Sequence, residues 1–103
     1  MPLDYFKYTP SETVTFYPLG NTDNEIQVTA VVYRQTTTVE YGNRVRPIDL
    51  HLPRGTDPGE IETLTVGQDE ILVRVRPYGG EERCRVIRLM EADMFTWFVR
   101  CMA

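Results

Sequence analysis

Apolar and polar residues alternate with a period of two along most of the chain, and turn-forming residues interrupt this alternation at short intervals. Such alternation is typical of β-strands that bury one face, and closely spaced turns are typical of antiparallel sandwiches and barrels. The pattern predicts strands over residues 13–17, 26–34, 45–52, 61–66, 70–76 and 81–90. We therefore expect an all-β fold: an antiparallel small barrel or sandwich of six or seven strands with one long hairpin loop.

Two of these strands carry apolar residues in phase, so each has one face suited to a core. The in-phase residues are Ile26, Val28, Ala30 and Val32 in one strand and Ile48, Leu50 and Leu52 in the other. The second face of the first strand is only half polar, because it holds Val31 and Tyr33, which is consistent with its being covered. Pro47 lacks a backbone N–H and indicates either an edge position or the start of a strand.

The hairpin predicted from residues 70–76 and 81–90 has a self-consistent register. Pairing Arg76 with Glu81 places Val73 opposite Cys84 and Ile71 opposite Val86. These four apolar residues then share one face, as the register of a half-buried hairpin requires. This face is the predicted contribution of the hairpin to the core.

The same register places Arg74 opposite Arg83 on the solvent face. Like charges that face each other across strands destabilise a sheet by roughly a few tenths of a kcal/mol unless something neutralises them. Glu70, Glu81 and Glu82 lie within reach in the same domain. An acidic patch on a partner is the alternative source of neutralising charge.

Three segments have a less definite pattern. Residues 1–12 read as an extended arm whose aromatic side chains pack either on this domain or on a neighbour. Residues 35–43 form either a long loop or an excursion of a hairpin beyond the body. Residues 91–102 combine helical spacing with strand alternation, and their β-branched and aromatic composition favours a strand.

The composition suits one folded domain spanning residues 1–103, with 42% hydrophobic and 25% charged residues. A net charge of −4 argues against binding nucleic acid through its phosphates. Lys7 is the only lysine beside ten arginines, which reflects either codon bias in a GC-rich genome or a surface built for carboxylate contacts. Neither a signal peptide nor a membrane-spanning stretch is expected from the hydropathy pattern.

The residues with catalytic or metal-binding chemistry form no complete site. His51 and Asp49 share a strand face, but no further ligands accompany them, so we interpret both as polar surface residues. Ser11, the only serine, has no nucleophile motif around it. The alternation points Cys84 inward, and we expect it and Cys101 to be reduced thiols buried as small hydrophobic residues. The sequence predicts no enzyme, no cofactor and no metal.

The residues best placed for protein contacts lie in the long loop and on the solvent face of the later hairpin. Long loops on compact domains are usually functional, and arginine suits contacts with carboxylates. The candidate interaction residues are Thr37, Val39, Glu40, Tyr41, Arg44, Arg46, Arg74, Arg83 and Arg85.

Several segments follow one another in a characteristic order between about residues 14 and 88. They are Val-Thr-Phe at 14–16, Val-Thr-Ala-Val-Val at 28–32, a long loop, Leu-Thr-Val-Gly-Gln-Asp-Glu-Ile-Leu-Val-Arg-Val at 64–75, a Gly-Gly turn and a final strand. In this order the chain resembles the small β-barrel proteins that join head to tail in tailed bacteriophages, the head completion or stopper proteins. The resemblance covers about three quarters of the chain.

The resemblance implies a non-catalytic structural connector of a phage or prophage. Such a protein assembles as a homo-oligomeric ring, docks on a portal or adaptor and offers its other side to tail proteins, in the virion or in the bacterial cytoplasm. Contact with nucleic acid is then expected only as it passes through the ring. It implies that residues 35–43 face the channel or a neighbouring subunit and that the termini make intersubunit contacts. The apolar segment 94–102 departs from the polar or basic ends of such proteins. The alternative function is a small β-barrel binding module of a bacterial cell that recognises a peptide or small ligand.

Overall fold

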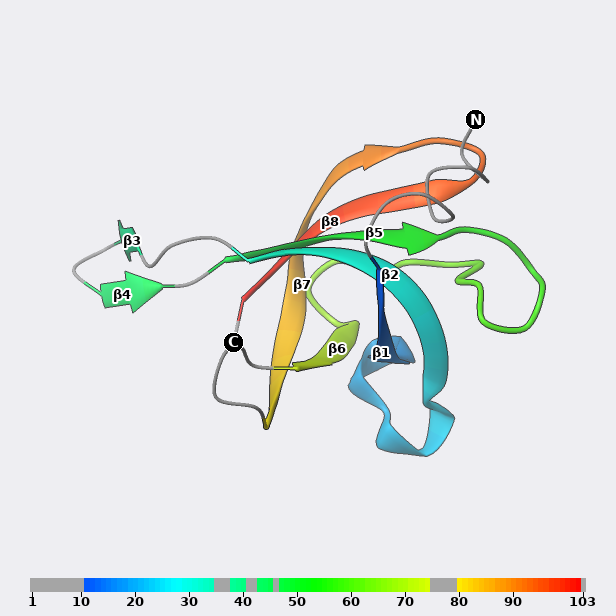
Figure 1. Cartoon of the computed structure of the whole chain (residues 1–103), viewed down its shortest axis with the longest axis horizontal. Helices are drawn as coiled ribbons and strands as arrows, with labels where there is room; N and C mark the ends of the chain where they lie inside the picture. Colours follow the sequence, from blue (N-terminus) through cyan, green and yellow to red (C-terminus); the bar gives the residue numbers. More distant parts are fainter. Residues whose placement is uncertain (1–10, 35–37, 41–42, 46, 75–79, 103) are drawn as a thin grey trace.

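The computed structural model describes residues 11–34, 38–40, 43–45, 47–74 and 80–102, and it contains a closed antiparallel β-barrel (Figure 1). The barrel strands are β1 (Glu12–Tyr17), β2 (Ile26–Arg34), β5 (Ile48–Pro53), β6 (Glu70–Arg74), β7 (Glu81–Ala92) and β8 (Thr96–Met102). Their order around the barrel is β1-β2-β5-β8-β7-β6, and β6 returns to pair with β1. The all-β prediction is confirmed, with six strands in the barrel.

Two other features complete the described chain. The short strands β3 (Thr38–Glu40) and β4 (Asn43–Val45) form a separate two-stranded sheet that projects away from the barrel (Figure 1). Two 3-10 turns, Pro18–Gly20 and Thr22–Asn24, connect β1 to β2. Of the two alternatives for residues 35–43, the hairpin excursion is therefore the one observed over the described positions. Within the described residues, no helix has the length and apolar content needed to cross a membrane.

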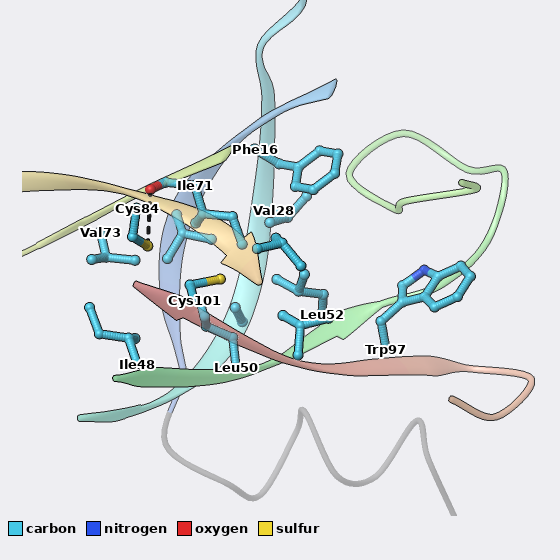
Figure 2. Packing of buried hydrophobic residues seen from close by; sticks show 14 of the residues in the cluster. Phe16, Val28, Ile48, Leu50, Leu52, Ile71, Val73, Cys84, Trp97 and Cys101 are labelled. Atoms are coloured by element: carbon cyan, nitrogen blue, oxygen red, sulfur yellow. Dashed lines mark hydrogen bonds between the residues drawn. The ribbon is translucent and has the colours of Figure 1, made fainter. Parts of the chain in front are cut away.

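Inward-facing residues of all six strands fill the barrel. The buried cluster consists of Val14, Phe16, Val28, Ala30, Ile48, Leu50, Leu52, Ile61, Ile71, Val73, Cys84, Val86, Trp97, Val99 and Cys101. Figure 2 shows side chains from strands on opposite sides of the barrel meeting in this interior. The two-residue period of the sequence accounts for this core, because successive side chains on a strand point to opposite faces.

Two long strands let the sheet close. β2 pairs with β1 through residues 26–30 and with β5 through residues 31–34. β7 pairs with β6 through residues 81–85 and with β8 through residues 85–92. The β7–β8 pairing shifts register twice, between Val86 and Arg88 and between Leu89 and Glu91. Such bulges add twist to a strand and help a curved sheet to form.

The predicted register of the β6–β7 hairpin is wrong by two residues. Ile71 lies opposite Cys84, and Arg74 lies opposite Glu81 rather than opposite Arg83. The four residues expected on the buried face, Ile71, Val73, Cys84 and Val86, are all at most 1% exposed. A shift of two positions leaves every side chain on its face, so the inward alternation is correct although the pairs are not.

The strand predicted over residues 61–66 is also wrong. In this region Ile61 forms an isolated bridge with Arg54, and a turn follows at residues 65–69. The buried carboxylate of Asp69 accepts hydrogen bonds from the backbone N–H groups of Thr65 and Leu19. These bonds hold the backbone of residues 65–69 in a compact turn instead of a strand.

The remaining predicted elements agree with the fold. The strand expected over residues 45–52 begins at Ile48, directly after Pro47, as the missing N–H of proline suggested. The C-terminal segment is a strand from Thr96 to Met102, which settles the choice between strand and helix. The expected N-terminal arm falls largely on residues 1–10, which lie outside the described residues.

Candidate interaction surface

The hairpin formed by β7 and β8 carries most of the exposed apolar side chains of the described residues. Beyond Val86, β7 pairs with β8 alone, and every residue from 87 to 92 is exposed. Ile87, Leu89, Met90, Met94 and Phe95, which we call the hairpin patch, are 43%, 40%, 37%, 80% and 39% exposed. The sequence analysis missed this surface. The signal was present, because each bulge coincides with two adjacent apolar residues, Val86-Ile87 and Leu89-Met90, where the alternation breaks.

The turn between these strands, residues 91–95, is acidic as well as apolar. Asp93 shapes the turn, because its Oδ1 accepts hydrogen bonds from the Phe95 N–H at 2.7 Å and the Thr96 N–H at 2.8 Å. These two backbone bonds lower the pKa of Asp93, so the carboxylate is charged at neutral pH. Glu91 is exposed and forms no ion pair with any described residue. The turn thus carries two negative charges beside Met94, and the Arg54 guanidinium, which donates to the Asp93 carbonyl at 2.9 Å, lies next to them.

A second surface feature lies at the other end of β7, around two arginines. A hollow of about 600 Å³ is lined by Glu70, Arg83, Cys84, Arg85, Ile87 and Met102, and we call it the arginine hollow. Glu70 sits between the guanidinium groups, with Arg83 on Oε1 and Arg85 on Oε2 at 3.3 Å. Its pKa is lowered mainly by the Arg83 hydrogen bond. One carboxylate facing two guanidinium groups leaves the hollow with a net positive charge.

The two arginines of this hollow differ in how firmly they are held. The Arg83 guanidinium also donates to the Gly20 carbonyl at 2.8 Å and lies 4.4 Å from the centre of the Tyr17 ring. Among the described residues, the Arg85 side chain has only the shared ion pair with Glu70, and it is 59% exposed. Arg83 is therefore a fixed wall of the hollow, whereas Arg85 retains donors for a further carboxylate.

The candidate interaction residues fall into three groups in the structure. Arg83 and Arg85 come together on Glu70, while Arg74 lies at the end of β6 opposite Glu81. Val39, Glu40 and Arg44 belong to the projecting hairpin, where Val39 pairs with Arg44 and Glu40 with Asn43. Thr37, Tyr41 and Arg46 lie outside the described residues. Glu70 and Glu81, both named as neutralising residues, face these arginines within the domain.

The interpretation of Asp49 as a surface residue is wrong. Asp49 is 4% exposed, and Arg100 donates to both of its oxygens, from Nε at 2.9 Å and from a terminal nitrogen at 3.1 Å. The partner residue is 51 positions away in sequence, so local pattern did not reveal the pair. The His51 ring stacks on Phe98 at 4.2 Å. Burial lowers the pKa of His51, and Glu91 and Asp93 partly oppose this shift.

The two cysteines lie in the interior of the barrel. Cys84 and Cys101 are free thiols inside the barrel, at 1% and 0% exposure, as the alternation predicted (Figure 2). The Cys84 thiol donates to the Ile71 carbonyl at 3.4 Å. The neighbouring Cys84 and burial raise the pKa of Cys101, so its reactive thiolate form is disfavoured. Across the described residues, no cluster of three or more His, Cys, Asp or Glu side chains is arranged to hold a metal ion.

Comparison of the chain with protein-family models, with curated proteins and with solved structures finds no match in any of the three.

Proposed function

We propose that this chain is a non-catalytic structural connector that acts through protein–protein contacts and ring assembly, as the head–tail joining proteins of phages and prophages do. The hairpin patch is the observation that carries the proposal. Soluble monomers rarely expose contiguous apolar surface unless it serves an interaction. Here five of the eight large apolar side chains that are exposed among the described residues lie on one hairpin, and only Leu19, Tyr33 and Val66 lie elsewhere.

The construction of the barrel supports a role carried out on its outer surface. Side chains of all six strands occupy the interior, and this cluster includes large residues such as Phe16, Leu50 and Trp97. A barrel filled in this way differs from barrels that enclose a ligand in their centre. The projecting parts, which are the β7–β8 hairpin and the β3–β4 hairpin, are then the natural places for contact with other proteins. On this proposal the partners are further copies of the chain and portal, adaptor or tail proteins, in the virion or in the bacterial cytoplasm.

The mass of the protein in solution tests the proposal. Sedimentation velocity and native mass spectrometry of the full chain over a wide concentration range should reveal a concentration-dependent ring of defined copy number. Electron micrographs of the same fractions should contain closed annular particles. A protein that remains strictly monomeric at every concentration would contradict ring assembly by this chain. A portal or major-capsid gene within a few reading frames would support the connector function independently.

A second candidate function is a bacterial binding module that recognises a peptide or small ligand. The arginine hollow favours it, because an exposed guanidinium next to apolar Ile87 and Met102 suits a short segment with a carboxylate and an apolar side chain. Saturable binding of acidic peptides by a monomeric protein, measured by calorimetry, would favour this function. Ring formation without such binding would favour the connector.

A further inference from the structure

We infer that the turn at residues 91–95 of one copy docks in the arginine hollow of the next copy, so that copies join head to tail. This inference deepens the proposed function and rests on the assembly of the chain with itself. It assigns at the same time the occupant of the hollow and a target for Met94 and Phe95 of the hairpin patch.

The two surfaces match in charge. The turn presents Glu91, which forms no ion pair with any described residue, and the charged Asp93. The hollow presents Arg85, whose exposed guanidinium shares a single carboxylate with Arg83. A carboxylate from a neighbouring copy would balance the second guanidinium. Complementary charges of this kind speed encounter and fix the register of a contact.

The two surfaces also match in their apolar parts. Met94 is 80% exposed at the tip of the turn, and Phe95 beside it is 39% exposed. The hollow has Ile87 and Met102 among its lining residues, and Ile87 is itself 43% exposed. Methionine side chains adapt well to irregular apolar surfaces. Docking would therefore remove apolar surface from water on both copies while the charges pair at the rim.

The positions of the two surfaces along β7 determine the kind of assembly. Arg85 lies in the half of β7 that pairs with β6, and Glu91 lies near the end that pairs with β8 alone. Six residues of strand separate them by roughly 20 Å, so the turn of one copy does not reach its own hollow. A contact between two different surfaces is heterologous, and it generates a ring where the rotation between copies closes. This geometry agrees with a ring-forming connector.

Charge-reversal variants mixed in solution test the contact. Arg85→Glu alone and Glu91→Arg alone each place like charges in every contact, and each should weaken self-association at least about tenfold. In an equimolar mixture, the unchanged turns of the first variant meet the unchanged hollows of the second, and the two substituted surfaces meet each other. Assembly should therefore return in the mixture, with the two variants alternating around an even-numbered particle. Sedimentation velocity and native mass spectrometry, which resolves the two masses, measure both effects.

Matched controls separate this contact from the fold and from the proposed function. Glu25→Arg makes the same charge change at an exposed site just before β2, which pairs with neither β7 nor β8, and should leave assembly unchanged. Met94→Gln removes only the apolar tip, and like Glu91→Arg it leaves the core intact, so the test stands even where Arg85→Glu unfolds. Circular dichroism checks the fold of each variant.

The possible outcomes are distinct. A parent protein that never associates overturns both the proposed ring and this contact. A parent that forms rings while the Glu91 and Met94 variants assemble equally well overturns this contact alone. Assembly that ends at a dimer overturns the head-to-tail arrangement, because two copies would then fill each other's hollows. Loss in the single variants with recovery in the mixture supports the inference.

Discussion

Asp49 is a carboxylate held almost entirely out of water on the outside of β5, and the guanidinium of Arg100 meets both of its oxygens. Removing one member of a buried ion pair is costly, because the buried carboxylate of Asp49 then has one partner fewer to compensate its charge. We predict that Arg100→Gln lowers the free energy of unfolding by about 3 kcal/mol, measured by urea denaturation at neutral pH.

A partly exposed ion pair provides the control for this prediction. Arg85→Gln removes the 3.3 Å contact with Glu70, in which the arginine side chain is 59% exposed. Water compensates the remaining charges there, so the loss should be at most about 1 kcal/mol. Equal losses for the Arg85 and Arg100 variants would contradict the burial argument.

The ionisation of Glu70 makes the stability of the folded protein depend on pH in the acidic range. Its pKa is lowered from the ordinary value of 4.5, first by the hydrogen bond from Arg83 and further by Arg85. A carboxylate with a lowered pKa in the folded state contributes stability that is complete above pH 4.5 and is lost as the pH falls through the folded value. We predict that the urea midpoint falls more steeply below pH 4.5 in the parent than in Glu70→Gln. Parallel pH profiles would show that the two arginines do not stabilise the charged carboxylate.

At the scale of single elements, the two halves of β7 differ in how deeply their side chains are buried. Its first half alternates between an inward and an outward face, with Cys84 and Val86 buried, and its second half is exposed throughout. We predict that Val86→Ala destabilises the protein by about 2 kcal/mol by opening a cavity in the core. Ile87→Ala, one residue along, should change stability by at most about 0.5 kcal/mol. Thermal unfolding of the two variants makes the comparison, and a large loss at Ile87 would mean that this side chain is buried in the folded state.

The sequence predicted which face of a strand each side chain occupies better than it predicted which residues pair across strands. Period-two alternation identifies inward residues such as Ile71 and Cys84, but it does not distinguish registers that differ by two positions, because both keep every side chain on its face. In the observed register Arg74 pairs with Glu81, so the connection comprises residues 75–80 and is two residues longer than the predicted pairing of Arg76 with Glu81 allows. Alternation also failed at residues 61–66, where the Thr65 N–H donates to the Asp69 carboxylate four residues later and a turn replaces the strand.

The same limit explains which parts of the candidate surface could be predicted. Arginines on the solvent face follow from alternation, and Arg83 and Arg85 do lie together. Their common partner Glu70 depends on the register, which brings it opposite Arg85. The pairing of Asp49 with Arg100 depends on β5 and β8 being neighbours in the closed barrel. Contacts between strands that are distant in sequence can be predicted only when the order of the strands in the barrel is known. The local sequence pattern does not reveal this order.

For the whole molecule, the closed sheet and the filled interior leave the outer surface to carry the function. Every barrel strand has neighbours on both sides over at least part of its length, so association through a continuous free edge is limited. The exposed second half of β7 and the turn after it extend past this closed region (Figure 1). Contacts between copies are therefore expected to involve side chains of this hairpin, with both apolar and charged components.

The charged part of the proposed contact predicts how the rate of association depends on salt. Salt screens attraction between exposed charges, and the Debye length falls from about 10 Å at 0.1 M to about 3 Å at 1 M. If Glu91 and Arg85 of neighbouring copies attract each other, the association rate of the parent should fall by about tenfold between low and high salt. Glu91→Gln should associate more slowly than the parent at low salt and respond less to salt, because only the apolar contact and Asp93 remain. Stopped-flow light scattering over a salt series measures both rates. An identical salt response in the parent and in Glu91→Gln would show that this carboxylate takes no part in the encounter.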